Sequence, residues 1–148
     1  MKKTRKLLAL ISVVLLLVFA VTSCAPPKPS GEVTIVLSGE SEVKYVVDTD
    51  QIENCRNLID VLEYLKVNQG LSYTMDGTML STIGDLTNDF SASKYICVYT
   101  SVESDFDVSD WATSVEYEGK TLWSSRFGID GMTILPGSIV YFKVISYA

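Results

Sequence analysis

Histidine is absent from this chain of 148 residues. Its absence excludes Ser-His-Asp and Cys-His catalysis and removes the commonest metal-binding side chain. The sequence also lacks a glycine-rich phosphate loop, a zinc-ligand spacing and a nucleophile elbow. Carboxylate pairs such as Asp48 and Asp50 remain, but nothing nearby in sequence separates the pKa of one from the other. We therefore expect a protein that is not an enzyme and that carries no cofactor.

Basic residues are few, and they are unevenly distributed. The chain has 12 basic and 18 acidic residues, and four of the basic ones but none of the acidic ones lie in the first 23 positions. The rest of the chain therefore has a net charge of −10. A domain this acidic repels phosphate backbones and anionic lipid head groups. Nucleic acid is excluded as a partner, and any membrane association needs a separate anchor.

Residues 1–23 have the pattern of a bacterial lipoprotein signal peptide. An uncharged apolar run of about 14 residues, from Leu7 to Ala20, fits a signal core and is too short for a spanning helix. The segment from Val21 to Cys24 resembles a lipobox, in which the leader is cut before an acylated cysteine. A positive cluster precedes the run: Lys2, Lys3, Arg5 and Lys6.

These features predict that Cys24 is the lipid attachment site and that the chain sits at the extracytoplasmic face of the cell membrane. The alternative is an ordinary secreted protein, although an A-x-A-like cleavage site is missing. Residues 24–31 hold three of the four prolines and predict a short, stiff tether. Residues 32–148 would then form one folded domain.

The domain has the pattern of an α+β fold. Two β-branched segments, 32–38 and 43–48, predict a hairpin, and further strands are expected around 71–75, 95–100, 115–117 and 120–123. The nearly continuous apolar run 139–145 is typical of a strand covered on both faces. This order of elements suits a β-grasp-like fold, in which a small mixed sheet packs on one helix.

One helix is expected between Asn57 and Gly70. Four apolar side chains recur at helical spacing and share one face: Leu58, Val61, Leu62 and Leu65. Asn57 is a suitable N-cap with Asp60 three residues later, as in a capping box, and Gly70 is a suitable C-cap.

The chain from about Glu32 onward resembles the transcobalamin-like C-terminal domain family, which is common in bacterial lipoproteins. The segments that carry the resemblance are 57–62, 77–84, 95–100, 120–128 and 135–138 followed by the final strand. The resemblance implies a β-grasp-like fold. It also implies a binding module, since better-known relatives form one wall of a cobalamin site.

Two cysteines, Cys55 and Cys97, remain besides Cys24. A disulfide between them would close a loop of about 42 residues and stabilise the fold by about 4 kcal/mol in the chain-entropy model, and an exported protein can form one. Alternatively, both are small buried apolar side chains. No basic cluster in the sequence would lower either thiol pKa.

The acidic segment from Glu103 to Asp110, which includes Asp105 and Asp107, could collect a calcium ion. It lacks the glycine and the final glutamate of an EF-hand loop, so we interpret it as a solvated acidic loop and expect no metal site.

Aromatic side chains gather in the second half of the chain. If some of them line one exposed surface, they would form a ligand or partner site. The candidates for ligand binding are Trp111, Trp123, Tyr95 and Tyr99, with Trp111 the best candidate for exposure because it lies in a polar loop.

Taken together, these patterns predict a membrane-anchored, non-catalytic binding module for a corrinoid or another small ligand, acting with a partner surface protein or transporter. The alternative is a protein–protein interaction or adhesion module on the cell surface. A concave aromatic pocket would favour the first, and a flat patch with a polar rim the second.

Overall fold

A computed structural model describes residues 28–147 of the chain. The predicted signal peptide, Cys24 and the first part of the predicted tether lie outside the described residues. Among the residues described, no helix is long and apolar enough to cross a membrane. Within the described residues, every helix and strand lies between Glu32 and Ser146, so a chain that starts at Ala25 retains all of them.

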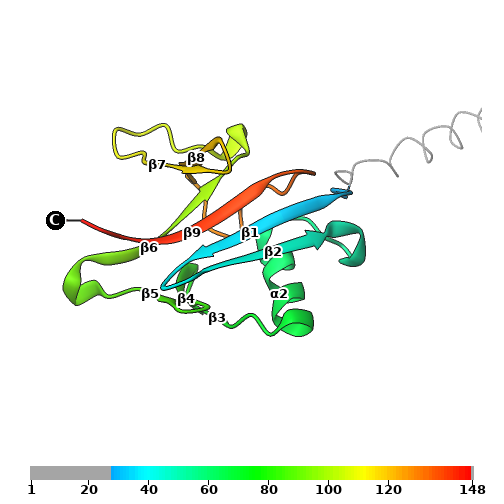
Figure 1. Ribbon diagram of the computed structural model, residues 1–148, viewed down its shortest axis with the longest axis horizontal. Coiled ribbons are helices and arrows are strands. Elements are labelled where there is room, and N and C mark those ends of the chain that lie inside the picture. Colours follow the sequence, from blue (N-terminus) through cyan, green and yellow to red (C-terminus); the bar gives the residue numbers. More distant parts are fainter. Residues whose placement is uncertain (1–27, 148) are drawn as a thin grey trace, which may run out of the picture.

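Residues 28–147 form two sheets and one α-helix (Figure 1). The larger sheet has six strands in the order β2-β1-β9-β6-β8-β7, and the smaller has three in the order β3-β4-β5. The strands β1 and β9 are parallel, and the other paired strands are antiparallel. The elements are β1 (Glu32–Ser38), β2 (Glu42–Asp48), η1 (Thr49–Gln51), α2 (Leu58–Gln69), β3 (Tyr73–Asp76), β4 (Met79–Ile83), β5 (Leu86–Thr87), η2 (Phe90–Ala92), β6 (Lys94–Thr100), η3 (Glu103–Asp105), β7 (Ser114–Tyr117), β8 (Lys120–Ser124) and β9 (Ile139–Ser146).

The predicted helix is confirmed at both ends. Asn57 Oδ1 accepts a hydrogen bond from the Asp60 backbone N–H, and Asp60 Oδ2 accepts one from the Asn57 N–H, which makes a capping box. Gly70 ends α2 in the left-handed conformation with φ of 70°, which glycine adopts without steric cost. The four apolar residues of the predicted face are all buried.

The main core lies between one face of the six-stranded sheet and a layer made of α2 and the three-stranded sheet. Alternate residues of the central strands point into it, including Ile35 and Leu37 of β1 and Val140 and Phe142 of β9. From the other layer it receives Leu62 and other residues of α2, and the buried apolar residues of β3, β4 and β5. Figure 1 shows this layer on one side of the sheet.

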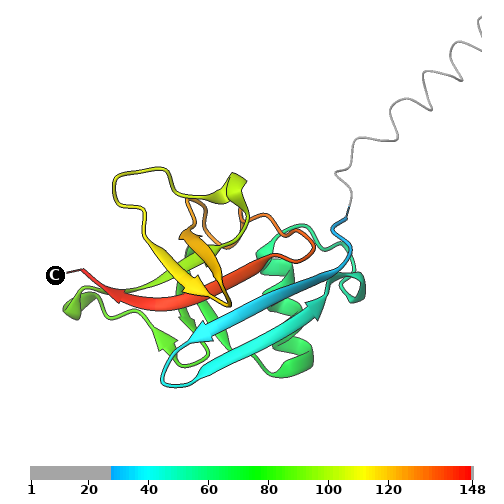
Figure 2. The same ribbon diagram turned by 45° about the horizontal axis from the view of Figure 1, so that its top comes forward.

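A second, smaller core covers the opposite face of the same strands. The β7–β8 hairpin folds over this face, so that Tyr117 and Leu122 pack with Val36, Ile139 and Tyr141 (Figure 2). Lys44 Nζ on the edge strand β2 lies 2.7 Å from Glu118 Oε1 at the hairpin tip, so an ion pair links the tip to this strand. The final strand is therefore covered on both faces, as its apolar sequence predicted.

The expectation of a β-grasp-like small mixed sheet packed on one helix is wrong. The chain is α+β, but it is mostly β, and it divides its strands between two separate sheets. Two features were not foreseen. Residues 73–87 form a sheet of their own beside the helix, and the β7–β8 hairpin turns over the large sheet to build a second core. Both depend on contacts between distant segments, which local strand patterns do not specify.

The last residues of the predicted tether are fixed to the domain. The backbone N–H of the buried Thr49 donates to Gly31 O at 3.0 Å, and Thr49 Oγ1 lies within 2.9 Å of both Pro29 O and Gly31 O. Gly31 has φ of 135° and lies against Pro136, where a Cβ would come within 3.0 Å of the proline ring. The chain therefore enters the domain at a defined place, beside the turn that contains Pro136.

Candidate functional site

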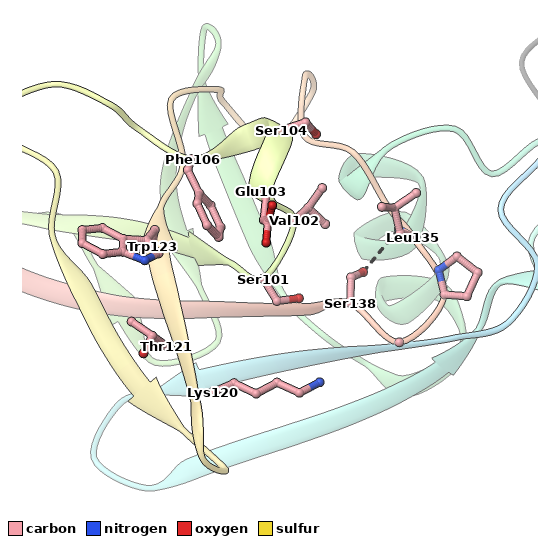
Figure 3. Close-up of a pocket in the computed structure, with 12 residues that line it drawn as sticks. Ser101, Val102, Glu103, Ser104, Phe106, Lys120, Thr121, Trp123, Leu135 and Ser138 are labelled. Carbon is pink, nitrogen blue, oxygen red and sulfur yellow. Dashed lines mark hydrogen bonds between the residues drawn. The ribbon is translucent and has the colours of Figure 1, made fainter.

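The candidate site is an open cleft of about 810 Å³ beside this turn. Three segments far apart in sequence form it: residues 101–106 around η3, strand β8, and the turn from Leu135 to Ser138. Figure 3 shows Trp123 and Phe106 on one side of the cleft and Leu135 and Ser138 on the other. Its volume lies within the range of small-molecule sites, which is about 300–1,000 Å³.

An aromatic pair lines one wall of the cleft. The ring centroids of Phe106 and Trp123 are 6.4 Å apart, and the rings are tilted by 44°. Trp123 remains 38% exposed, although the adjacent Leu122 is completely buried. Alternation along β8 therefore gives Leu122 to the core and directs the indole of Trp123 toward the cleft. A partly exposed ring pair of this kind can bury the flat apolar face of a ligand.

Two charged side chains of opposite sign also line the cleft. Lys120 lies at the start of β8 and Glu103 at the start of η3, and both are exposed (Figure 3). Within residues 28–147, neither makes an ion pair within 4 Å. The cleft thus offers an aromatic wall, a cation, a carboxylate and several serine hydroxyl groups, which suits an amphipathic ligand with polar groups at its edge.

A buried carboxylate holds the cleft walls together. Asp105 is only 1% exposed. Its oxygens accept hydrogen bonds from the Thr133 backbone N–H at 2.6 Å, from Thr133 Oγ1 at 3.0 Å and from Ser104 Oγ at 3.1 Å. Since Thr133 lies two residues before Leu135, Asp105 ties the η3 wall to the segment that leads into the opposite wall.

The prediction of a solvated acidic loop is therefore wrong for Asp105, whose carboxylate is a buried structural acceptor. Asp107 Oδ1 accepts a hydrogen bond from the Ser109 backbone N–H at 2.9 Å. Hydrogen bonds from the backbone and the side chain of Ser109 lower the pKa of Asp107. The remaining carboxylates of the segment, those of Glu103 and Asp110, are exposed. The described part of the chain holds no group of three His, Cys, Asp or Glu side chains that could bind a metal ion.

The four predicted ligand-binding aromatics do not share one site. Trp123 lines the cleft, whereas Trp111 is 80% exposed on the loop between η3 and β7. Tyr95 lines a second, smaller cavity beside β6. Tyr99 is 2% exposed in the smaller core, where burial raises its pKa to about 12. The cleft residues that the sequence interpretation missed are Phe106, Lys120 and Leu135, because no local pattern joins their three segments.

Of the two alternatives for Cys55 and Cys97, the structure has free thiols and no disulfide between them. Cys55 lies in the main core beside the start of α2. Cys97 packs on the smaller core, on the opposite face of the six-stranded sheet. The sheet therefore separates the two sulfur atoms. The interpretation as a buried apolar side chain agrees with Cys55, whereas Cys97 is only partly buried.

Both thiols should react slowly with alkylating reagents near neutral pH. Burial raises the pKa of Cys55 and that of Cys97, so the reactive thiolate is scarcer at a given pH than for a free cysteine of pKa about 8.5. In the chain from Ala25 onward, iodoacetamide labelling without reductant should be slow when folded and complete at both cysteines when unfolded. A peptide disulfide linking Cys55 to Cys97 in mass spectra would contradict this arrangement.

Comparison with known proteins adds information on the fold alone. No known protein-family model matches this chain, and no curated protein matches it. Its fold is similar to the crystal structure of a "putative metal binding protein" from Ruminococcus gnavus ATCC 29149. The TM-score is 0.51 at 11% sequence identity, over 80% of this chain and 100% of the other.

Proposed function

We propose that this chain is an extracytoplasmic lipoprotein, anchored through acylated Cys24, whose domain is a non-catalytic binding module. The cleft between η3, β8 and the Leu135–Ser138 turn is its binding site. The observation that carries the proposal is the partly exposed Phe106–Trp123 pair, which lines a cleft of about 810 Å³. Lys120 and Glu103 also line it, and neither forms an ion pair with any other residue of the range 28–147. A structural neighbour described as a putative metal binding protein is compatible with binding rather than catalysis.

A corrinoid or another small amphipathic molecule is the ligand class that we propose. The resemblance to the transcobalamin-like C-terminal domain family suggests a corrinoid, and the tilted aromatic pair of the cleft can contact an apolar ligand surface. A metal ion is not the ligand that we propose, since the described residues contain no cluster of side chains that could bind one.

The anchor places this cleft close to the membrane. Three residues lie between Cys24 and Lys28, so the two are at most about 14 Å apart. Lys28 Nζ donates to the Asp50 carbonyl, and Gly31 lies against Pro136, which lines the cleft. A ligand held there could pass to a membrane transporter. Mass analysis of the mature chain from bacterial membranes should give a diacylglyceryl group on Cys24. Cys24→Ser should abolish both the acylation and the cleavage, since no A-x-A-like site offers another cut. An intact, unacylated leader on the unsubstituted chain would contradict the anchor.

Two single-tryptophan variants test the cleft. The chain contains two tryptophans, of which only Trp123 lines the cleft. In the soluble chain from Ala25, Trp111→Phe leaves Trp123 as the reporter, and cyanocobalamin should quench its fluorescence saturably. Trp123→Phe leaves Trp111, which does not line the cleft, and its emission should be quenched less strongly than that of Trp123. Equal saturable quenching in both variants, or none in either, would contradict corrinoid binding in the cleft.

A second candidate function is a protein–protein interaction or adhesion module. Several large apolar side chains lie exposed outside the cleft, on the loop before β7, in η2 and after β9. They are Val108, Trp111, Phe90 and Tyr147. Tyr95 joins Phe90 and Tyr147 into one aromatic group, with ring centroids 5.7 and 5.8 Å apart. Exposed aromatic side chains are common at the centres of protein interfaces.

A further inference from the structure

Strand β6 has a gap in the hydrogen bonding of one edge. It pairs with β9 along its whole length, but on its other side β8 pairs only with Tyr99 and Thr100. Lys94 exchanges backbone hydrogen bonds with Asp89, which lies on the side away from β9. Because the backbone groups of alternate residues point to the same edge of a strand, Ile96 and Val98 also direct their N–H and C=O groups away from β9.

Two of these four backbone groups have partners, and two do not. The Ile96 N–H donates to Asn88 Oδ1 at 2.7 Å, and the Val98 C=O accepts from the Ser125 N–H at 2.8 Å. Among residues 28–147, none forms a hydrogen bond with the Ile96 C=O or the Val98 N–H. An acceptor and a donor therefore lie two residues apart on the same strand edge, between Asn88 and Ser125.

The same edge lines a separate cavity of about 350 Å³. Ile96 and Val98 form part of one wall, and the segments 78–80 and 125–129 form the others. Met79 and Phe127 are partly exposed cavity residues, and Leu80 and Ile129 are buried ones. The cavity thus combines a mostly apolar lining with one free backbone acceptor and one free backbone donor, a combination typical of small-molecule sites.

We propose that this cavity binds a small apolar molecule that carries a carboxamide or lactam group. The amide N–H of the ligand would donate to the Ile96 C=O, and its carbonyl would accept from the Val98 N–H, as a neighbouring strand residue does in a parallel pair. Asn88 and Ser125 already occupy the edge on either side, so there is no room for a continuing peptide strand. This site is separate from the aromatic cleft and does not depend on the function proposed for it.

The probe for this site is hydrocinnamamide, a phenyl group on a short chain that ends in a primary carboxamide. Methyl hydrocinnamate, the matched control, keeps the phenyl group and the carbonyl but lacks the N–H donor. In amide-resolved NMR of the isotope-labelled chain from Ala25, the carboxamide should shift the Val98 N–H downfield in a saturable manner. The ester should bind about tenfold more weakly, because it leaves the Ile96 carbonyl unpaired.

Two truncations of exposed aromatic residues complete the test. Phe127→Ala removes part of the cavity lining and should weaken binding of the carboxamide, whereas Trp111→Ala, at a more exposed position outside the cavity, should leave its affinity unchanged. The proposal is overturned if the Val98 N–H does not respond up to the solubility limit of the probe. Equal affinities of the amide and the ester would also overturn it.

Discussion

Replacing Phe142 by alanine should destabilise the protein by about 3–5 kcal/mol, the usual cost of truncating a fully buried phenylalanine. Phe142 is completely buried in the main core, on the strand that lies between β1 and β6. Its loss removes apolar contact and leaves a cavity that the surrounding strands can close only in part. Urea unfolding followed by circular dichroism measures the change, since domains of this size usually unfold in one step.

Val46→Ala provides the matched control for this substitution. Val46 lies on the edge strand β2 and is largely exposed, so its truncation should change the free energy of unfolding by about 0.5 kcal/mol or less. If Phe142→Ala were as mild as Val46→Ala, the placement of β9 between two cores would be incorrect.

Replacing Asp105 by alanine should cost about 2–4 kcal/mol, because it leaves the partly buried Thr133 N–H without its acceptor and removes two further hydrogen bonds. Asp105→Asn keeps an amide oxygen that can accept from the Thr133 N–H and should cost less. Asp110→Ala, an exposed carboxylate of the same segment, should be nearly neutral. Thermal and urea unfolding of the three variants gives the comparison.

The Asp105 substitution should also affect the cleft. The carboxylate joins the η3 wall to Thr133, and Thr133 in turn bridges to Asn57 at the start of α2. Without this link, the segment that carries Phe106 is less firmly held, and the affinity for a cleft ligand should fall even at temperatures where the variant stays folded. An Asp105→Ala variant with unchanged stability would show that the acidic segment is solvated, as the sequence alone had suggested.

Elements fixed by local chemistry were predicted from the sequence. The capping box of Asn57 and Asp60, the four-residue apolar face of α2 and the left-handed Gly70 each depend on residues within one or two turns of helix. The Leu135–Ser138 turn was likewise predicted from its Pro-Gly centre, and Gly137 adopts φ of 76° there. The strands 32–38, 94–100 and 139–146 also follow their β-branched and aromatic composition.

The site could be predicted only in part. Trp123 was among the ligand-binding candidates, but its partner Phe106 and the charged Lys120 were not, because the cleft is formed by three separate segments, 101–106, 120–123 and 135–138. Asp105 looked like a surface charge because aspartates surround it in sequence. Its burial depends on Thr133, which lies 28 residues away. The two backbone groups of β6 without partners, the Ile96 C=O and the Val98 N–H, could not be predicted either. Every residue type except proline has the same backbone N–H and C=O groups, so the sequence does not indicate which of them lack a partner.

The measurement that tests the binding-module proposal most directly is a residue-by-residue map of ligand-induced shifts in amide-resolved NMR. The isotope-labelled chain from Ala25 would be titrated with cyanocobalamin. We predict that the largest shifts fall on the three cleft segments, 101–106, 120–123 and 135–138. Saturable shifts confined to the exposed apolar residues outside the cleft, around Trp111, Phe90 and Tyr147, or no saturable shifts at all, would contradict a binding site between η3, β8 and the Leu135–Ser138 turn.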